Sequence, residues 1–123
     1  MKNGETIGIF NYDDLIIDGK HSLDVKGVTV ASGQGKLSRG TILAINAAGK
    51  AVILGTEESE KKLAADCILT DDIDATKADV YTAAYESGNF NKNALIVKEG
   101  YNLAADDVAM LRTKGIFTES GMN

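Results

Sequence analysis

Short runs of β-branched and apolar residues, separated by turn-prone residues, recur along most of this 123-residue chain. The clearest example is the stretch 78–97, where an alternating run at 79–85 precedes Gly and Asn at 87–89 and an apolar run at 94–97. Val, Tyr and Ile favour the pleated, half-buried surface of a sheet, whereas Gly and Asn tolerate the backbone angles of tight turns. This stretch therefore predicts a strand, a turn and a short continuation.

Five further strands are predicted from the same kind of pattern, at residues 28–31, 42–45, 51–54, 67–70 and 116–118. The uncharged run 42–45 is expected to be buried on both faces and to pair with the run at 51–54 as a hairpin. The stretch 32–35 is expected to form a loop. The charged stretch 56–66 is expected to be exposed; it could form one helical turn but is too short for a stable helix.

One helix is predicted, over residues 102–114. Apolar residues recur there at helical spacing, at Ala104, Val108 and Leu111. The side chain of Asn102 can cap the first turn, and Gly115 is suited to end the last one. The chain is therefore predicted to be mainly β with one C-terminal helix, an α+β domain.

The first 25 residues differ from the remainder because their apolar clusters show neither a helical period nor a clear hairpin partner. The two clusters and the tyrosine between them supply the candidate contact residues of this stretch, Ile7, Ile9, Phe10, Tyr12, Leu15, Ile16 and Ile17. The stretch is either an edge strand with a loop or an extended arm that adds to the sheet of another chain by backbone pairing. We divide the chain into an arm at 1–25, a compact domain at 26–118 and a frayed end at 119–123.

The charge balance argues against two classes of partner. The 13 basic and 18 acidic residues give a net charge of −5, and no dense basic cluster appears. Binding to a phosphate backbone requires such a cluster, so neither nucleic acid nor an anionic membrane is an expected partner. The longest uncharged run, 40–49, is far shorter than the roughly 20 apolar residues of a membrane span. The start lacks an apolar signal-peptide core, so synthesis in the cytoplasm is expected.

Residues that could support catalysis are few. The one cysteine, Cys67, precedes two apolar residues and is expected to be a buried, inert thiol. The one histidine, His21, stands in a polar turn with no evident link to it. The loop at 32–38 lacks the spacing of a phosphate-binding loop, and the acidic residues at 71–74 lack the spacing of an EF-hand. We predict that the protein is not an enzyme and uses no cofactor or metal.

Four of the seven aromatic residues stand between positions 81 and 101. Tyr81, Tyr85 and Phe90 are either core residues or anchors of an interface between subunits, since a tyrosine at a rim keeps its hydroxyl in water while its ring is buried.

Residues of about 26–118 resemble the lambda-like head decoration proteins of tailed bacteriophages. The resemblance is carried by Leu37-x-Arg39-Gly40-Thr41-Ile42-Leu43, by Ala65-x-Cys67-Ile68-Leu69, by the stretch from Val80-Tyr81-Thr82 to Ala94-Leu95, and by the closing helix with Gly115-Ile116. Two features depart from the family pattern. Cys67 stands where the family usually has Gly, and no proline occurs in the loops.

The resemblance implies a β-clip-like small barrel that assembles as a homotrimeric spike at the threefold positions of the expanded capsid. It also implies that the arm binds the phage major capsid protein and that the trimer stabilises the head against internal DNA pressure. The protein would be made in the host bacterial cytoplasm and reside on the exterior of the phage head. The alternative is a small β-rich ligand- or glycan-binding module, which requires a concave polar pocket lined by Tyr81, Tyr85 or Tyr101.

Overall fold

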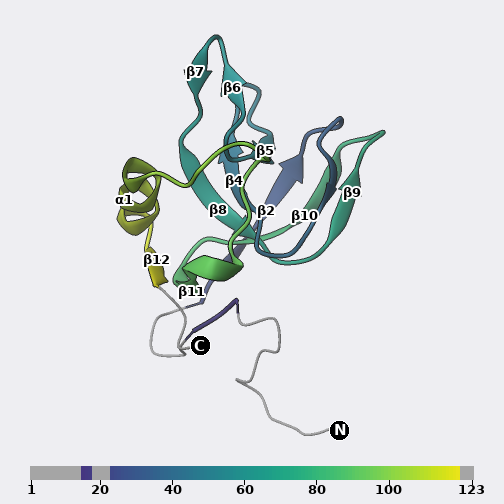
Figure 1. The fold of residues 1–123 in the computed structure, drawn as a ribbon. Coiled ribbons are helices and arrows are strands. Elements are labelled where there is room, and N and C mark those ends of the chain that lie inside the picture. Colours follow the sequence, from purple (N-terminus) through teal and green to yellow (C-terminus); the bar gives the residue numbers. More distant parts are fainter. Residues whose placement is uncertain (1–14, 18–22, 120–123) are drawn as a thin grey trace, which may run out of the picture.

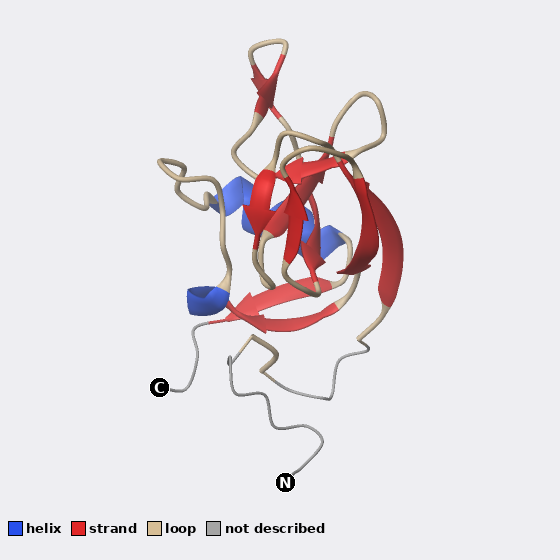
Figure 2. Cartoon of the chain, turned by 90° about the vertical axis from the view of Figure 1, so that its right-hand side faces the viewer, coloured by secondary structure: helices blue, strands red, loops and turns tan. Residues whose placement is uncertain are grey.

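The computed structural model describes residues 15–17 and 23–119, and in them β-strands predominate, with one α-helix near the C-terminal end (Figure 1). This confirms the predicted fold class. Five strands close into a small barrel-like ring, in the order β10 (Val80–Tyr85), β2 (Val25–Val30), β5 (Ala51–Ile53), β4 (Ile42–Ile45) and β8 (Ala65–Leu69). Seen from the side in Figure 2, the strands curve around a common interior, and Figure 1 shows the helix beside the ring, to the left of β8.

The predicted hairpin forms a well-buried part of the ring. Strands β4 and β5 are antiparallel, with Leu43 opposite Ile53 and Ala44 opposite Val52. The turn between them is built around Asn46, whose side-chain oxygen accepts hydrogen bonds from the backbone N–H groups of Ala48 and Lys50. The pairing confirms the predicted hairpin, and residues 42–44 are buried as predicted, whereas Ile45 is half-buried.

The alternation of side chains along the strands creates two apolar cores, because neighbouring residues of a strand point to opposite faces. One core fills the interior of the ring and contains Leu43, Cys67 and Leu69. The other lies outside the ring and includes Ile42, Ile68, Phe90, Leu111 and Ile116. Strands β4 and β8 contribute side chains to both cores. Both of their faces are therefore apolar, which explains why their sequences are nearly continuous apolar runs.

Three two-stranded sheets surround the ring. They pair β11 (Gly88–Asn91) with β12 (Ile116–Glu119), β3 (Gly35–Leu37) with β9 (Ile73–Ala75), and β6 (Glu57–Glu58) with β7 (Lys61–Lys62). The turn predicted at 87–89 lies instead at Glu86 and Ser87, because the backbone from Gly88 onward pairs in parallel with a strand 28 residues later, Gly88 lying opposite Ile116. The charged stretch 56–66 forms a hairpin rather than a helical turn. The loop predicted at 32–35 ends one residue earlier, because strand β3 begins at Gly35.

The helix α1 (Ala105–Thr113) begins three residues later than predicted. Ala104 is extended, with φ −100° and ψ 163°, and its backbone N–H donates to the Asp107 carboxylate at 3.0 Å. Asn102 is exposed and lies outside the helix. The run at 94–97 does not continue as a strand, since the 3₁₀-helix η1 (Lys92–Ala94) ends there and only Ile96 bridges Thr41.

Candidate functional site

The part of the proposed arm that the structure describes, residues 15–17, is fixed against its own domain. Leu15 is 2% exposed and belongs to the outer core. Ile16 forms an antiparallel bridge with Phe90. The Asn91 N–H donates to the Leu15 carbonyl at 2.7 Å, and the Ile17 N–H donates to the Asn89 carbonyl at 3.0 Å. We therefore limit the proposed arm to residues 1–14, and its candidates Ile7, Ile9, Phe10 and Tyr12 lie outside the described residues.

The two ends of the described chain lie on either side of the same strand, β11. Strand β11 pairs with residues 15–17 on one edge and with β12 on the other, where Asn91 lies opposite Glu119. Figure 1 shows β11 and β12 at one end of the molecule and the β6–β7 hairpin at the opposite end. Segments that continue from Leu15 and from Glu119 consequently start from the same end of the domain.

The three aromatic interface candidates are not on one surface. Phe90 is fully buried, and Tyr85 is 8% exposed with its ring centroid 5.4 Å from that of Phe90. The Arg39 guanidinium lies 5.6 Å from the Tyr85 ring centroid and donates to its hydroxyl at 2.7 Å. Of the two interpretations, core packing describes Tyr85 and Phe90. Tyr81, which is 77% exposed, is left as the interface candidate.

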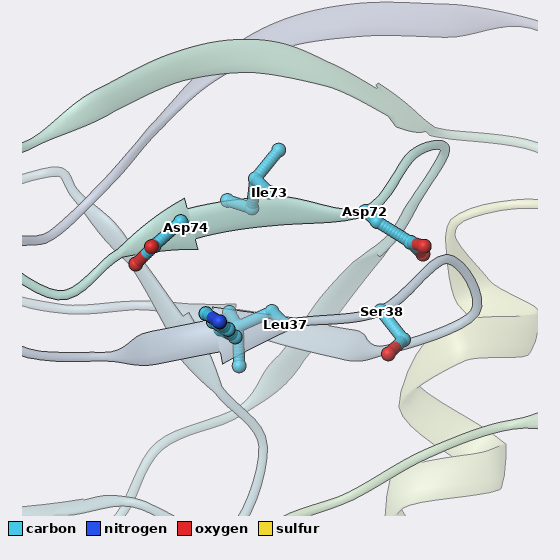
Figure 3. A pocket seen from close by; sticks show the side chains of 6 residues that line it. Leu37, Ser38, Asp72, Ile73 and Asp74 are labelled. Atoms are coloured by element: carbon cyan, nitrogen blue, oxygen red, sulfur yellow. The ribbon is translucent and has the colours of Figure 1, made fainter.

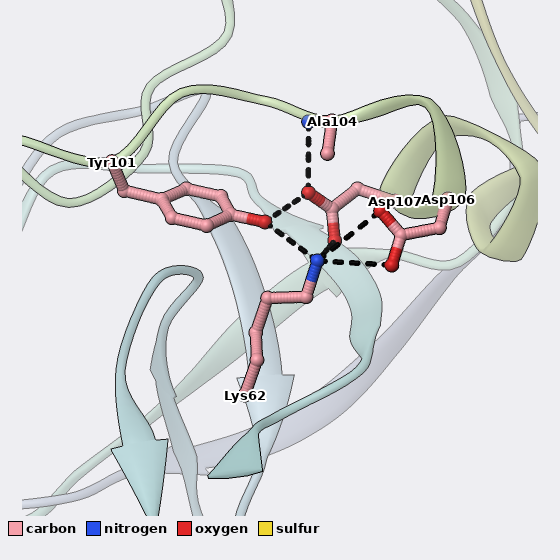
Figure 4. A network of polar contacts seen from close by, with 5 residues as sticks. All are labelled: Lys62, Tyr101, Ala104, Asp106 and Asp107. Carbon is pink, nitrogen blue, oxygen red and sulfur yellow. Dashed lines mark hydrogen bonds and ion pairs between the residues drawn. The ribbon is translucent and has the colours of Figure 1, made fainter. Parts of the chain in front are cut away.

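A polar cluster connects the β6–β7 hairpin to the start of the helix (Figure 4). The Lys62 ammonium donates to the Tyr101 hydroxyl at 2.9 Å and lies 3.0 Å and 3.2 Å from carboxylate oxygens of Asp106 and Asp107. The Tyr101 hydroxyl and the Ala104 N–H both donate to Asp107, which is 2% exposed. No local pattern indicated this cluster, because Lys62 precedes its partners by about forty residues.

The Asp107 carboxylate stabilises the fold in a pH-dependent way. Burial would raise the pKa of Asp107, but the hydrogen bonds from Tyr101 and Ala104 and the charge of Lys62 outweigh it and lower that pKa. Since the folded pKa is below the unfolded value of about 3.9, the contribution is complete above that value and is lost as the pH falls toward the folded pKa. The cluster is therefore a structural clamp that acid weakens.

Replacing Asp107 with Asn is expected to lower the free energy of unfolding by about 1–3 kcal/mol at pH 7, because a buried acceptor loses its charge and part of its hydrogen bonding. Urea titrations at pH 7 and pH 3 measure it, and the difference from the wild type should shrink at pH 3. Asp106→Asn is the matched control, since that side chain is 71% exposed, and should cost about 0.5 kcal/mol or less. Equal losses for the two variants would contradict the clamp.

Two shallow depressions flank the ribbon formed by β3 and β9. One, of about 380 Å³, is lined by Lys36, Leu37, Ser38, Asp72, Ile73 and Asp74 (Figure 3). The other, of about 530 Å³, shares Lys36 and Asp74 and reaches Val80. No tyrosine lines either depression, so neither is the tyrosine-lined pocket that a glycan-binding module requires.

The residues with reactive side chains are placed for packing. Cys67 is fully buried in the inner core, and this burial raises the pKa of its thiol to about 12, as expected for an inert thiol. Within residues 15–17 and 23–119, no three His, Cys, Asp or Glu side chains are grouped so that they could hold a metal ion. In the same residues, no helix has the length and apolar character that crossing a bilayer requires.

Comparison with known families decides between the interpretations. The model of the family "Bacteriophage lambda head decoration protein D" matches residues 6–116. The chain belongs to this family. The match confirms the resemblance seen in the sequence and extends it into the arm. No curated protein matches the chain. As a head decoration protein, the chain has a structural role in association with the exterior of the phage capsid, and the family is not known for catalysis.

Proposed function

We propose that this head decoration protein binds the outer surface of the expanded phage capsid at threefold sites as a homotrimer and stabilises the head against the internal pressure of packaged DNA. The observation that carries the proposal is the family match over residues 6–116. The arm, residues 1–14, binds the major capsid protein by adding to one of its sheets through backbone pairing.

The placement of the chain ends supports this function. Residues 15–17 fix the base of the arm on β11, next to β12 at one end of the domain (Figure 1). In a trimer with its threefold axis perpendicular to the shell, three such bases can face the shell together. After one arm binds, the other two bind at high effective concentration, so modest contacts for each arm give tight attachment.

Stabilisation of the shell follows from selective binding. A ligand shifts an equilibrium only by its difference in affinity for the two states, so the trimer must bind the expanded lattice more tightly than the unexpanded one. The net charge of −5 and the lack of a basic cluster suit the outer face of the shell, because binding to the packaged DNA would require clustered basic residues.

Co-sedimentation with empty capsids tests the proposal. We expect the protein to pellet with expanded shells and to remain in the supernatant with unexpanded shells, and we expect imaging of the expanded shells to show three copies at each threefold site. Decorated shells should rupture at a higher temperature than bare ones. Equal binding to both kinds of shell, or binding without an effect on rupture, would contradict the proposed role.

A further inference from the structure

Exposed apolar residues are concentrated along one side of the ring. Leu23, Val25 and Tyr81 are 44%, 55% and 77% exposed and are three of the five large apolar side chains that lie in water among the described residues. Because side chains alternate along a strand, Val25, Gly27 and Thr29 of β2 point to one face of the sheet. The residues opposite them on β10 are Tyr85, Ala83 and Tyr81, of which Tyr85 is buried. We call this surface the β2 flank; it consists of Leu23, Val25, Gly27, Thr29, Tyr81 and Ala83.

The Tyr81 side chain leans across this flank toward Gly27 of β2. A Cβ atom added to Gly27 would be 1.9 Å from the Tyr81 hydroxyl oxygen, so the ring covers this glycine. The hydroxyl end of Tyr81 therefore occupies the space that a side chain at Gly27 would take, and the tyrosine remains 77% exposed. An exposed, positioned tyrosine in an apolar surface is typical of an interface anchor.

The backbone of β2 is open along the same side. Strand β2 pairs with β10 over its whole length but with β5 only at Val30. The Glu86 N–H donates to the Asp24 carbonyl, so residue 24 and alternate residues after it face β10. The N–H and C=O groups of Val25 and Gly27 face the other edge, where the described part of the chain provides no partner strand. An open edge beside exposed apolar side chains favours contact with another chain.

The lack of charge on the flank favours a second copy as its occupant. Two copies, each with a net charge of −5, repel one another unless they meet through a surface without charge. None of the six residues of the β2 flank is charged. The flank starts beside β11, where Leu23 lies against Gly88, and follows β2 away from that end (Figure 1). If that end faces the shell, the flank faces sideways, toward a neighbouring copy.

We propose that the β2 flank is the contact between neighbouring copies in the trimer, with Tyr81 as its anchor. The assignment rests on the proposed function, which supplies the trimer. It adds the surface through which the copies meet, which begins beside β11, where Leu23 lies against Gly88, and continues along β2. A stable interface buries about 800 Å² on each partner. Residues around the flank are therefore expected to contribute to the contact as well.

The substitution Val25→Glu tests the assignment, because it places a charge in the contact. Val25 is exposed in the single copy, so the fold is expected to survive, as circular dichroism will check. We expect the dissociation constant of the trimer to rise more than about a hundredfold, since an unpaired buried charge is strongly destabilising. The readouts are the assembled mass in solution and the number of copies at each threefold site on shells. Met110→Glu on α1, where Met110 is 39% exposed, is the matched control and should assemble like the wild type.

The outcomes separate the flank from the proposed function. A folded Val25→Glu protein that assembles like the wild type, in solution and on shells, would overturn the flank assignment and leave capsid binding intact. A wild-type protein that is monomeric in solution and occupies shells as single copies would overturn the trimer itself. Loss of assembly in Val25→Glu but not in Met110→Glu would support the assignment. Slower hydrogen exchange of the Gly27 amide in the wild type than in Val25→Glu would support it independently.

Discussion

Replacing Phe90 with Ala is expected to lower the free energy of unfolding by about 3–5 kcal/mol, as found for large aromatic residues removed from packed cores. Phe90 is fully buried, contacts the Tyr85 ring and stands in the strand that joins residues 15–17 to β12. Domains of this size have a total stability of about 5–15 kcal/mol, so the loss is a large part of it. Urea denaturation followed by circular dichroism measures the change.

Phe117 on β12 is the matched control for this prediction. It is only partly buried, and its ring lies 5.1 Å from the Arg112 guanidinium carbon. Phe117→Ala should cost clearly less than Phe90→Ala, about 1–2 kcal/mol, because a partly exposed ring loses less apolar burial. If the two substitutions cost the same, or if Phe90→Ala weakens assembly without changing the stability of the single copy, Phe90 would be an interface residue after all.

The elements that the sequence predicted correctly are those whose evidence is local. The β4–β5 hairpin could be recognised because two apolar runs enclose a turn centred on Asn46 and Gly49, and Gly49 has a positive φ of 81°. The helix could be recognised from its apolar spacing. Its start could not, because Asp107 binds the backbone N–H of Ala104 from within the helix, whereas the sequence favoured a cap at Asn102.

The elements that the sequence missed depend on distant partners. Strand β3 pairs with β9, placing Gly35 opposite Ala75, and strand β11 pairs with β12. Each is a short segment rich in Gly, Asn or charged residues, which turns also prefer. Only the partner strand makes such a segment extended, and no local pattern identifies that partner. The base of the arm was missed for the same reason, since Leu15 meets its core partners only in the folded domain.

For the candidate site, too, the sequence predicted some features and missed others. The exposure of Tyr81 and the burial of Phe90 could not be told apart from their residue types, since both aromatics suit cores and interfaces. The open edge of β2 was also invisible, because a strand edge is defined by which neighbours are absent. The family could be recognised from the order of its motifs, whereas the surfaces that carry out its role required the fold.

Removing residues 2–14 is expected to abolish capsid binding while leaving the domain intact. The deletion ends before Leu15, so no described contact of the domain is lost, and the free energy of unfolding should stay within about 0.5 kcal/mol of the wild type. Binding to expanded shells should fall at least about a hundredfold, because the gain from three linked arms disappears. Co-sedimentation over a range of protein concentrations measures the loss.

Two further variants show why the deletion must stop at residue 14. Extending it through residue 17 removes Leu15 from the core and should lower the free energy of unfolding by about 2–5 kcal/mol, so a loss of binding would then have two causes. Replacing Ile7, Ile9 and Phe10 together with Ser keeps the chain length and should reduce binding like the shorter deletion. If that protein and the shorter deletion both bind shells like the wild type, the attachment must lie in the folded domain, and the end that carries β11 and β12 becomes the surface to test.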